Sequence, residues 1–374
     1  MPIALDTETT TFNFGNAFDN RNKLVCFSIA DAKSSGAVLW DSHAKECLQL
    51  RINSERMVIG FNFKFDAHWF IKEGISLDGI QIWDVQTAHF LMSNQTHRFP
   101  SLNEVAEHWG LSCKLDVVKT EYWDKGIDTD KIPWPILEEY AAHDAYLTYQ
   151  CYVRQFAAMN PAQRTLCFLM GQDLLVLQDM EMNGLAFDEK LCEEESVKLD
   201  ARIKEITTYL ESIYPQIPIN FGSNDHLSAF LYGGIVKEDG KEFVGYFKSG
   251  QKVGQPKYKN VIIEHRLPGM YKPIKGSEMA KVGNYSVSED TLRKLKGNKK
   301  IVDLLLELAK LEKLNGTYYR GLVKLRKEKN WEPGVLHGQF NQCIAQTGRL
   351  SSSSPNLQNF ASDLQNIFIT TYGD

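Results

Sequence analysis

Short apolar runs alternate with amphipathic stretches over the first 160 residues of this chain. Short runs rich in Val, Ile and aromatic residues are typical of strands, and longer segments with apolar residues three or four apart are typical of helices. We therefore predict strands at Ile3–Leu5, Leu24–Ala30, Ala37–Trp40, Met57–Phe61 and Ile80–Trp83. Helices are predicted at Phe63–Lys72, Val85–Met92, Leu102–Trp109 and Ile136–Met159. This alternation predicts an α/β region, a mixed sheet with flanking helices, that ends near Asn160-Pro161.

Helical patterns dominate after residue 160, where strand signals nearly vanish. A helix is predicted at Thr165–Met182 and stops at Asn183-Gly184, a pair suited to a left-handed cap. A charged amphipathic helix follows and runs to about Ser212, and another helical stretch covers about 290–329. Residues 237–285 lie between them and are rich in Gly, Lys and Tyr. Such composition predicts a mobile, loop-rich segment.

Composition limits the class of protein. The chain has 374 residues, of which 43% are hydrophobic and 24% charged, as in soluble globular proteins of two or three domains. No apolar run approaches the roughly 20 residues of a membrane span, and no signal-peptide pattern is visible, so we expect no membrane partner. The seven cysteines have no zinc-type spacing and are interpreted as small core residues in a reducing cytoplasm.

Charge is distributed unevenly. Residues 1–150 carry 13 Lys/Arg against 21 Asp/Glu, a net of −8, and residues 286–330 carry 12 against 6, a net of +6. The acidic part is able to concentrate metal ligands and the basic part to hold phosphates, although charge runs are also common on solvated faces.

Two carboxylates follow the first predicted strand. Asp6 and Glu8 are expected in a Thr-rich turn at the end of Ile3–Leu5. Residues two apart on a strand share a face, so both side chains are able to converge on a cation. Hard oxygen ligands suit Mg²⁺ or Mn²⁺. The alternative is a solvated strand end followed by a helix cap.

Further acidic side chains follow at two other places. Asp66 comes soon after the strand at Met57–Phe61, near the start of a predicted helix, where the helix dipole alone also favours an acid. Tyr140 and Asp144 are four residues apart in a helical pattern and share a helix face, but they also fit a half-buried Tyr beside a surface Asp. His143 is an alternative general base beside them.

These residues in this order resemble the three motifs of the DEDD superfamily of 3′→5′ exonucleases, specifically the proofreading domain of family A DNA polymerases. The motifs read Asp-x-Glu, Asn-x-x-x-Asp and Tyr-x-x-x-Asp. The resemblance implies a ribonuclease-H-like fold, an attacking water oriented by Tyr140, and two divalent ions, Mg²⁺ or Mn²⁺, held by Asp6, Glu8, Asp66 and Asp144. It also implies contacts with the terminal nucleotides from Thr9, Phe12, Asn62 and Phe65.

Three later segments resemble the same family. Met180–Asp188 is similar to the linker before the thumb, and Leu311–Tyr319 is similar to a long thumb helix. The latter resemblance implies contacts with the duplex backbone from Lys313, Thr317, Tyr318 and Arg320.

The segment His337–Asn359 contains Thr-Gly-Arg-Leu-Ser-Ser-x-x-Pro-Asn-Leu-Gln-Asn, the core of a family A palm segment. The alternative interpretation of this segment is a surface loop rich in Ser, Gly and Pro. By the resemblance, Arg349 reaches a minor-groove acceptor that every base pair presents. The other substrate-binding residues implied here are Thr347, Asn356, Gln358 and Asn359.

We therefore expect an exonuclease domain at 1–160, a thumb at 161–335 with an insertion at 237–285, and the start of a palm at 336–374. The expected function is that of the N-terminal part of a family A DNA polymerase in DNA replication, with proofreading and primer–template binding. The palm carboxylates and fingers come later in the family, so residues 1–374 are expected not to polymerise alone. A second polypeptide that carries them is then expected to bind an apolar edge at 367–369, and a processivity partner is possible at the insertion.

Two alternatives remain open. One is a stand-alone DEDD exonuclease that acts on DNA or RNA. The other is a non-catalytic DNA-binding subunit of a split polymerase. With no 5′-nuclease domain ahead of the motifs, the pattern is closest to phage replicative enzymes, which work in the host cytoplasm.

Overall fold

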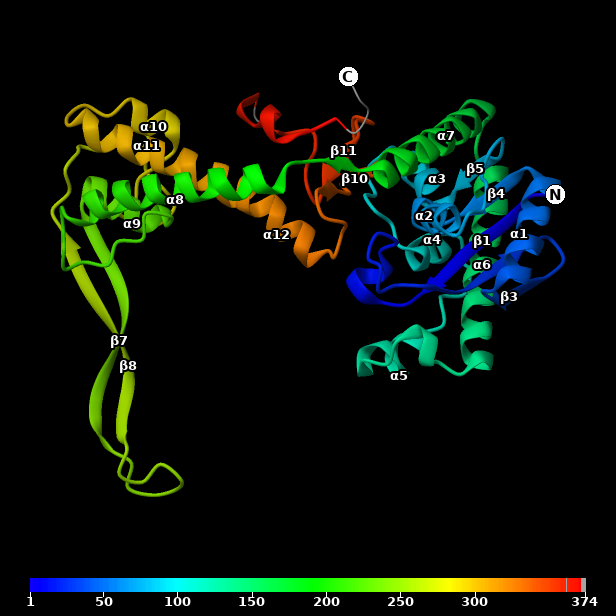
Figure 1. Ribbon diagram of the computed structural model, residues 1–374, viewed down its shortest axis with the longest axis horizontal. Coiled ribbons are helices and arrows are strands. Elements are labelled where there is room, and N and C mark those ends of the chain that lie inside the picture. Colours follow the sequence, from blue (N-terminus) through cyan, green and yellow to red (C-terminus); the bar gives the residue numbers. More distant parts are fainter. Residues whose placement is uncertain (361, 371–374) are drawn as a thin grey trace. The chain divides into compact units, whose positions relative to one another are not determined.

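A computed structural model describes residues 1–360 and 362–370 of the chain; Asp374, one of two carboxylates after the palm-like segment, lies outside the described residues. The chain divides into two compact units (Figure 1). Unit 1 contains Met1–Glu189 and Lys324–Asp374, and unit 2 contains Lys190–Val323. These boundaries differ from the predicted divisions after residues 160 and 335. No helix among the described residues is long and apolar enough to cross a membrane.

Unit 1 is built on a five-stranded mixed sheet of order β3-β2-β1-β4-β5. β1 pairs antiparallel with β2 and parallel with β4; β2–β3 is antiparallel and β4–β5 parallel. The strands are β1 (Ile3–Thr9), β2 (Leu24–Ala30), β3 (Ser35–Leu39), β4 (Met57–Gly60) and β5 (Gln81–Asp84). All five predicted strands are confirmed. β1 is longer than predicted, so Asp6 and Glu8 lie inside the strand and not in a turn after it.

Helices cover both faces of this sheet, and the alternation of side chains along each strand decides which face a residue meets. Ala4, Ile59 and Trp83 pack with α3, α4 and α6, whereas Ile3 and Val58 pack with α1 and α2. The helices are α1 (Ser42–Glu55), α2 (Lys64–Lys72), α3 (Val85–Met92), α4 (Leu102–His108), α5 (Val117–Glu121) and α6 (Trp134–Ala158). The four predicted helices are present; α1 and α5 were not predicted.

α7 (Pro161–Asn183) belongs to unit 1 because it packs closely against β5. Asn160 caps this helix, with its side chain accepting from Gln163 N, and Pro161 occupies the first turn. A Cβ on Gly171 would lie 2.3 Å from the Ile82 carbonyl oxygen. The predicted break at Asn160-Pro161 is therefore a helix start and not a boundary between compact units.

Residues 324–370 return to unit 1 beside the end of α7. β6 (Leu185–Ala186) pairs with β9 (Val335–Leu336), and β10 (Gln339–Asn341) pairs with β11 (Ser351–Ser353). The Glu189 carboxylate accepts two hydrogen bonds from Arg326, at 2.7 and 2.8 Å.

The predicted apolar edge is wrong in part. Ile367 ends a 3₁₀ helix at Ser362–Ile367, and its side chain is fully buried. Its carbonyl accepts from Asp188 N, and Phe368 bridges to Phe187. Ile369 alone of the three residues is more than half exposed.

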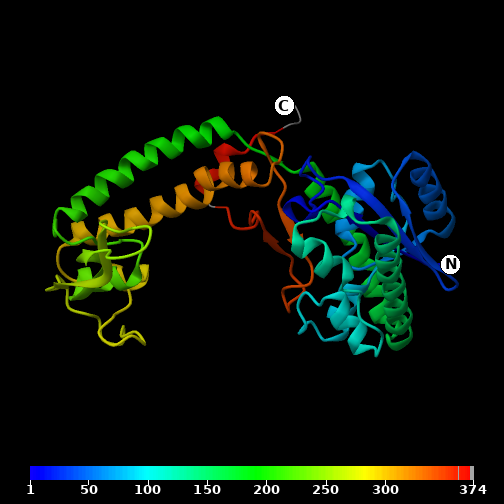
Figure 2. The same cartoon turned by 90° about the horizontal axis from the view of Figure 1, so that it is seen from below.

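Unit 2 has its own helical core. α8 and α11 lie side by side (Figure 2), and Arg202 of α8 donates to both carboxylate oxygens of Glu307 in α11 at 2.7 and 2.9 Å. The helices that begin or lie in this unit are α8 (Glu189–Glu211), α9 (Asn224–Tyr232), α10 (Glu289–Arg293), α11 (Lys299–Lys313), a π-helix at Leu314–Tyr319 and α12 (Arg320–Glu328). The predicted helical stretch 290–329 is interrupted between α10 and α11, whereas α11, the π-helix and α12 follow one another directly.

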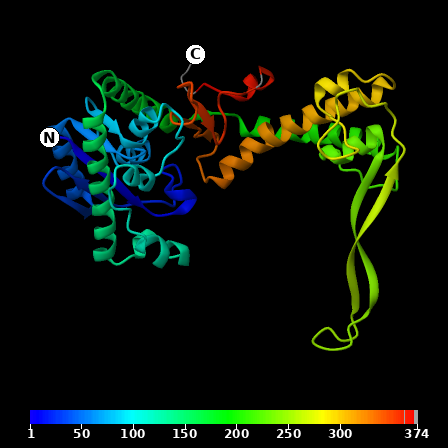
Figure 3. The same cartoon turned by 180° about the vertical axis from the view of Figure 1, so that it is seen from behind.

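The predicted loop-rich insertion is largely a β-hairpin. β7 (Gly234–Tyr246) and β8 (Pro256–Leu267) form a long antiparallel ladder with a register shift between Phe243 and Gly245. Figure 3 shows this twisted ribbon projecting from the helices of unit 2. Val236 and Leu267 at its base are buried, whereas large side chains farther along are exposed. Cross-strand hydrogen bonds therefore order a segment whose Gly- and Lys-rich composition hid the strands.

Candidate metal centre

The carboxylates of Asp6, Glu8 and Asp144 converge on one point in unit 1. Asp6 and Glu8 follow Ala4 on the face of β1 that α6 covers, and Asp144 comes from α6 itself. One carboxylate oxygen from each of the three lies within 4.8 Å of the others. Strand alternation and helix packing therefore bring together residues that are more than 130 positions apart in sequence.

Asp66 approaches from the helix α2, which covers the other face of the sheet. Thr7 lies between Asp6 and Glu8 and points to that face, where its hydroxyl donates to Asp66 Oδ1 at 2.5 Å. Asp66 is 2% exposed, and the negative charge of Asp6 acts on it. The fourth predicted ligand is thus beside the cluster but is not among the three convergent oxygens.

Burial and mutual repulsion shift the acidity of these groups. Burial, followed by the charge of Asp144, raises the pKa of Asp6 to about 7. Burial also raises the pKa of Glu8 and of Asp66 well above their usual range, and the charge of Asp6 adds to both shifts. Repulsion of this kind is relieved when a cation enters such a site.

Lys114 supplies a positive charge at the cluster, and sequence reasoning did not find it. Its ammonium forms an ion pair with Asp144 Oδ2 and lies 5.3 Å from the centroid of the Tyr140 ring. The charge of Asp144 raises the pKa of Lys114 against the effect of burial, which is the largest contribution and lowers it. Lys114 lies in the loop between α4 and α5, where no periodicity or spacing singles it out; only the packing of that loop on α6 reveals it.

Tyr140 precedes Asp144 by one turn of α6 and is almost completely buried. Its ring packs edge-on against Trp123, with centroids 5.8 Å apart. Burial and the charge of Asp144 raise the pKa of the Tyr140 hydroxyl, so it remains protonated at neutral pH. His143 makes a 3.0 Å hydrogen bond with the carbonyl of Cys113 and thereby contacts the loop that carries Lys114.

The donor set fits a divalent cation. Asp144 Oδ1 is buried and has no hydrogen-bond partner among the described residues, so one acceptor of the cluster is unsatisfied. A buried carboxylate oxygen without a partner is costly unless a ligand binds it. Oxygen-only donors are the set that Mg²⁺ and Mn²⁺ prefer.

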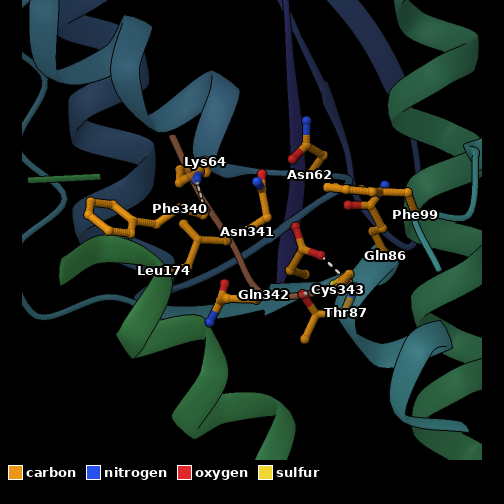
Figure 4. A pocket seen from close by; sticks show the side chains of 11 residues that line it. Asn62, Lys64, Gln86, Thr87, Phe99, Leu174, Phe340, Asn341, Gln342 and Cys343 are labelled. Atoms are coloured by element: carbon orange, nitrogen blue, oxygen red, sulfur yellow. Dashed lines mark hydrogen bonds between the residues drawn. The ribbon is translucent and has the colours of Figure 1, made fainter. Parts of the chain in front are cut away.

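The residues predicted to contact terminal nucleotides have different surroundings. Thr9 is buried at the end of β1, and Phe12 is 46% exposed in the loop that follows. Phe65 packs in a small cluster with Trp69. Asn62 has a positive φ of 52° and lines a cavity of about 40 Å³, together with Asp84 and residues from α3, α7 and 340–343 (Figure 4).

The residues predicted to contact duplex DNA lie in both units. In unit 2, Lys313, Thr317 and Arg320 are exposed and Tyr318 is half-buried. Arg320 forms an ion pair with Asp200, which also accepts from Asn315 at 2.9 Å. In unit 1 the predicted residues with exposed side chains are Thr347, Arg349, Asn356, Gln358 and Asn359.

Two family models match this chain. Residues 1–155 match the family described as 3′-5′ exonuclease, which covers the five-stranded sheet and the carboxylate cluster. Residues 252–370 match the family described as DNA polymerase family A.

Curated relatives agree with these matches. DNA polymerase I of Geobacillus stearothermophilus is 44% identical over 184 residues, which is 49% of this chain and 16% of that protein. DNA polymerase I of Synechocystis sp. is 27% identical over 307 residues, 80% of this chain and 26% of that protein. The DNA polymerase of Bacillus phage SP01 is 24% identical over 323 residues, 81% of this chain and 34% of that protein. The chain thus spans about a third or less of the length of these relatives.

A solved structure has a similar fold. It is the POL domain of Pol1 from M. smegmatis in complex with DNA primer-template and dNTP, with a TM-score of 0.59 and 21% sequence identity. The match covers 96% of this chain and 51% of that chain.

Proposed function

This chain belongs to DNA polymerase family A, with a 3′-5′ exonuclease region at residues 1–155, and on that premise we propose that it removes nucleotides from the 3′ end of single-stranded DNA. The proposed centre lies in a ribonuclease-H-like domain and holds two divalent ions, Mg²⁺ or Mn²⁺. The proposed context is proofreading during DNA replication.

One observation carries this proposal. Carboxylate oxygens of Asp6, Glu8 and Asp144 converge within 4.8 Å, and within residues 1–360 and 362–370 Asp144 Oδ1 has no hydrogen-bond partner. A structural role would leave such a buried oxygen hydrogen-bonded, whereas a cation site requires it to be available.

The protein groups then have distinct roles. Asp6, Glu8, Asp66 and Asp144 would hold the ions, which when bound supply a nucleophilic water and stabilise the charge that develops on the phosphate. Tyr140 keeps its proton and is proposed to orient the water through its hydroxyl. Thr7 fixes the Asp66 carboxylate through its 2.5 Å hydrogen bond.

The rest of the chain is proposed to bind the sugar–phosphate backbone of primer–template DNA. Exposed groups at Lys313, Thr317 and Arg349 are suited to phosphates and to sequence-independent contacts. Further contacts are proposed from Tyr318 and Arg320 in unit 2 and from Asn356, Gln358 and Asn359 in unit 1. Arg320 would have to exchange its Asp200 carboxylate for a DNA phosphate.

Hydrolysis of a 5′-labelled single-stranded oligonucleotide tests the nuclease proposal. With Mg²⁺ or Mn²⁺ we expect shortening from the 3′ end, and with EDTA none. Asp6→Ala and Asp144→Ala are each expected to lower the rate by several powers of ten and to leave DNA binding nearly unchanged. Glu46→Gln, an exposed acid of α1 on the opposite face of the sheet, is the matched control. Wild-type rates in both aspartate variants would reject the metal assignment.

Competition between DNA and RNA oligonucleotides separates this proposal from a stand-alone nuclease that acts on RNA. Any metal-dependent cleavage that Asp6→Ala abolishes rejects a purely DNA-binding role. Four further statements stay predictions. Residues 1–374 do not extend a primer alone, and a second polypeptide restores extension. A processivity partner binds at the hairpin, and the protein is cytoplasmic.

A further inference from the structure

The loop after β1 holds an exposed aromatic side chain in an unfavourable backbone conformation. Phe14 is 92% exposed, and its φ and ψ are 61° and 37°. Asn13 before it and Gly15 after it also have positive φ, 46° and 72°. A run of left-handed residues is rare, and Phe has no local side-chain hydrogen bond to favour it.

This conformation is held by a dense set of hydrogen bonds at both sides of Phe14. The Asn13 amide donates to Asp19 Oδ2 at 2.5 Å, and Asp19 is completely buried and also accepts from Asn330 at 3.0 Å. Asn22 donates to the carbonyl of Phe12 at 2.6 Å. The loop is therefore a built structure, and the exposure of Phe14 is not a result of missing contacts around it.

The loop also lies against the proposed nuclease site. Trp69 Nε1 donates to the Gly15 carbonyl at 2.9 Å. A Cβ on Gly15 would lie 2.3 Å from Thr9 Oγ1 and 3.2 Å from Phe65 Cζ. Thr9 adjoins Glu8 and Phe65 adjoins Asp66 in sequence, so the backbone next to Phe14 packs on the neighbours of two proposed metal ligands.

Phe12 and Arg21 add a second aromatic ring and a cation to the segment around Phe14. The Arg21 guanidinium lies 4.8 Å from the centroid of the Phe12 ring and donates to the Asp19 carboxylate. Proteins that bind single-stranded nucleic acid often place an exposed aromatic ring beside a cation, so that a base stacks on the ring and a phosphate lies near the charge.

We propose that Phe14 is a stacking platform for an unpaired nucleobase of the strand that enters the site, upstream of the terminal nucleotide. This inference rests on the proposed nuclease function and adds a source of substrate preference to it. The faces of a paired base are covered by its neighbours in the duplex, whereas an unpaired base is free to stack on Phe14. The platform therefore favours frayed or single-stranded 3′ ends over paired ones.

The left-handed backbone provides a variant that removes the ring without harming the fold. Glycine adopts positive φ without strain, so Phe14→Gly is expected to unfold at a temperature equal to or higher than that of the wild type. A side chain kept for stability would give the opposite result. Phe14→Trp retains a stacking surface, and Leu50→Ala removes an exposed apolar side chain from α1 as a control.

The test uses the full chain in EDTA, so that binding is measured without hydrolysis. Single-stranded oligonucleotides carry 2-aminopurine at one of the five 3′ positions, and both fluorescence quenching and anisotropy are recorded. We expect the wild type to quench at one or two positions upstream of the terminus. Phe14→Gly should abolish this quenching and weaken binding on the order of ten-fold, and Phe14→Trp should retain both.

Unchanged quenching and affinity in Phe14→Gly would overturn the proposal. A lower unfolding temperature in Phe14→Gly without a change in quenching would assign the ring to the fold and overturn it as well. Failure of the nuclease proposal is a separate result, namely no metal-dependent cleavage by the wild type. With cleavage present, Phe14→Gly should reduce the preference for single-stranded over paired 3′ ends.

Discussion

The Lys114 ammonium forms an ion pair with the Asp144 carboxylate at the centre of three convergent acids. Among the described residues, Lys114 is the cation that forms an ion pair with Asp144. Lys114 thus reduces the repulsion between the carboxylates before a metal ion enters.

Lys114→Met should therefore destabilise the metal-free chain more than the metal-bound chain. Loss of one partner of a buried ion pair is costly, and because the Lys114 side chain is 30% exposed we expect about 1–3 kcal/mol in EDTA. Thermal unfolding in EDTA and in Mg²⁺ checks this, with Lys119→Met on α5 as the control. An equal loss in both conditions would mean that Lys114 acts only through packing.

Tyr140→Phe should lower the nuclease rate only in part. The variant keeps the buried ring and its contact with Trp123 and removes one hydroxyl, so the loss should not exceed the roughly 10²–10⁴-fold of a positioned proton-transfer group. Single-turnover cleavage of labelled DNA measures it. A loss as large as that of Asp6→Ala would show that Tyr140 does more than orient the water.

The free energy of unfolding of the metal-free chain should fall as pH rises from about 4 to about 7. Burial raises the pKa of Asp6 from its ordinary value of 3.8 to about 7 in the folded chain, so the folded state binds more protons than the unfolded state in this window. Chemical denaturation at several pH values in EDTA measures the slope.

Asp6→Asn removes this titration, so its slope should be shallower than that of the wild type. Mg²⁺ should stabilise the wild type more at pH 8 than at pH 5, because protons no longer compete for the carboxylates. A stability that rises with pH between 4 and 7, with the same slope in Asp6→Asn, would contradict the raised pKa of Asp6.

Gly171→Ala should destabilise unit 1 by about 1–3 kcal/mol, because the added Cβ meets the Ile82 carbonyl at 2.3 Å and forces α7 away from β5. Differential scanning calorimetry checks this. Gly36→Ala in β3 is the control, since its Cβ would meet no atom within 4 Å. If both variants unfold like the wild type, α7 does not pack tightly on the sheet.

Removal of the outer hairpin should leave unit 2 folded. Lys241 and Asn260 are partners in the ladder, so an Asn-Gly turn between them replaces residues 242–259. Val236 and Leu267 at the base keep their buried contacts, and the free energy of unfolding should change by less than about 0.5 kcal/mol. A larger loss would show that the tip contributes to the core.

Strong local patterns allowed much of unit 1 to be predicted. β2 and α3 have the predicted ends because their apolar residues are dense and their boundaries are clear. α1 was missed because only Ala44, Leu48 and Ile52 are buried among many polar residues. The prediction ended β1 at Leu5 because Asp6 and Glu8 are typical of a turn, although pairing with Ser28 and Cys26 of β2 keeps them in the sheet.

The convergence of Asp6, Glu8 and Asp144 was predictable because their motifs resemble those of the DEDD exonucleases, in which each acid has a fixed spacing within its strand or helix. Lys114 and Phe14 were not, since each lies in a loop and acquires its position from distant contacts, through Asp144 and through Asp19 with Asn330. The β7–β8 hairpin was missed for a related reason: its order comes from cross-strand pairing and not from burial.

The β6–β9 pairing and the Glu189–Arg326 ion pair fasten together the two places where the chain leaves unit 1 and comes back. Because these contacts close the loop on the unit 1 side, the length of the excursion between them adds little further entropy cost. Residues 190–323 are in this sense an exchangeable cassette. We therefore expect that residues 190–323 can be lengthened, shortened or replaced while the sheet and helices of unit 1 keep their own contacts.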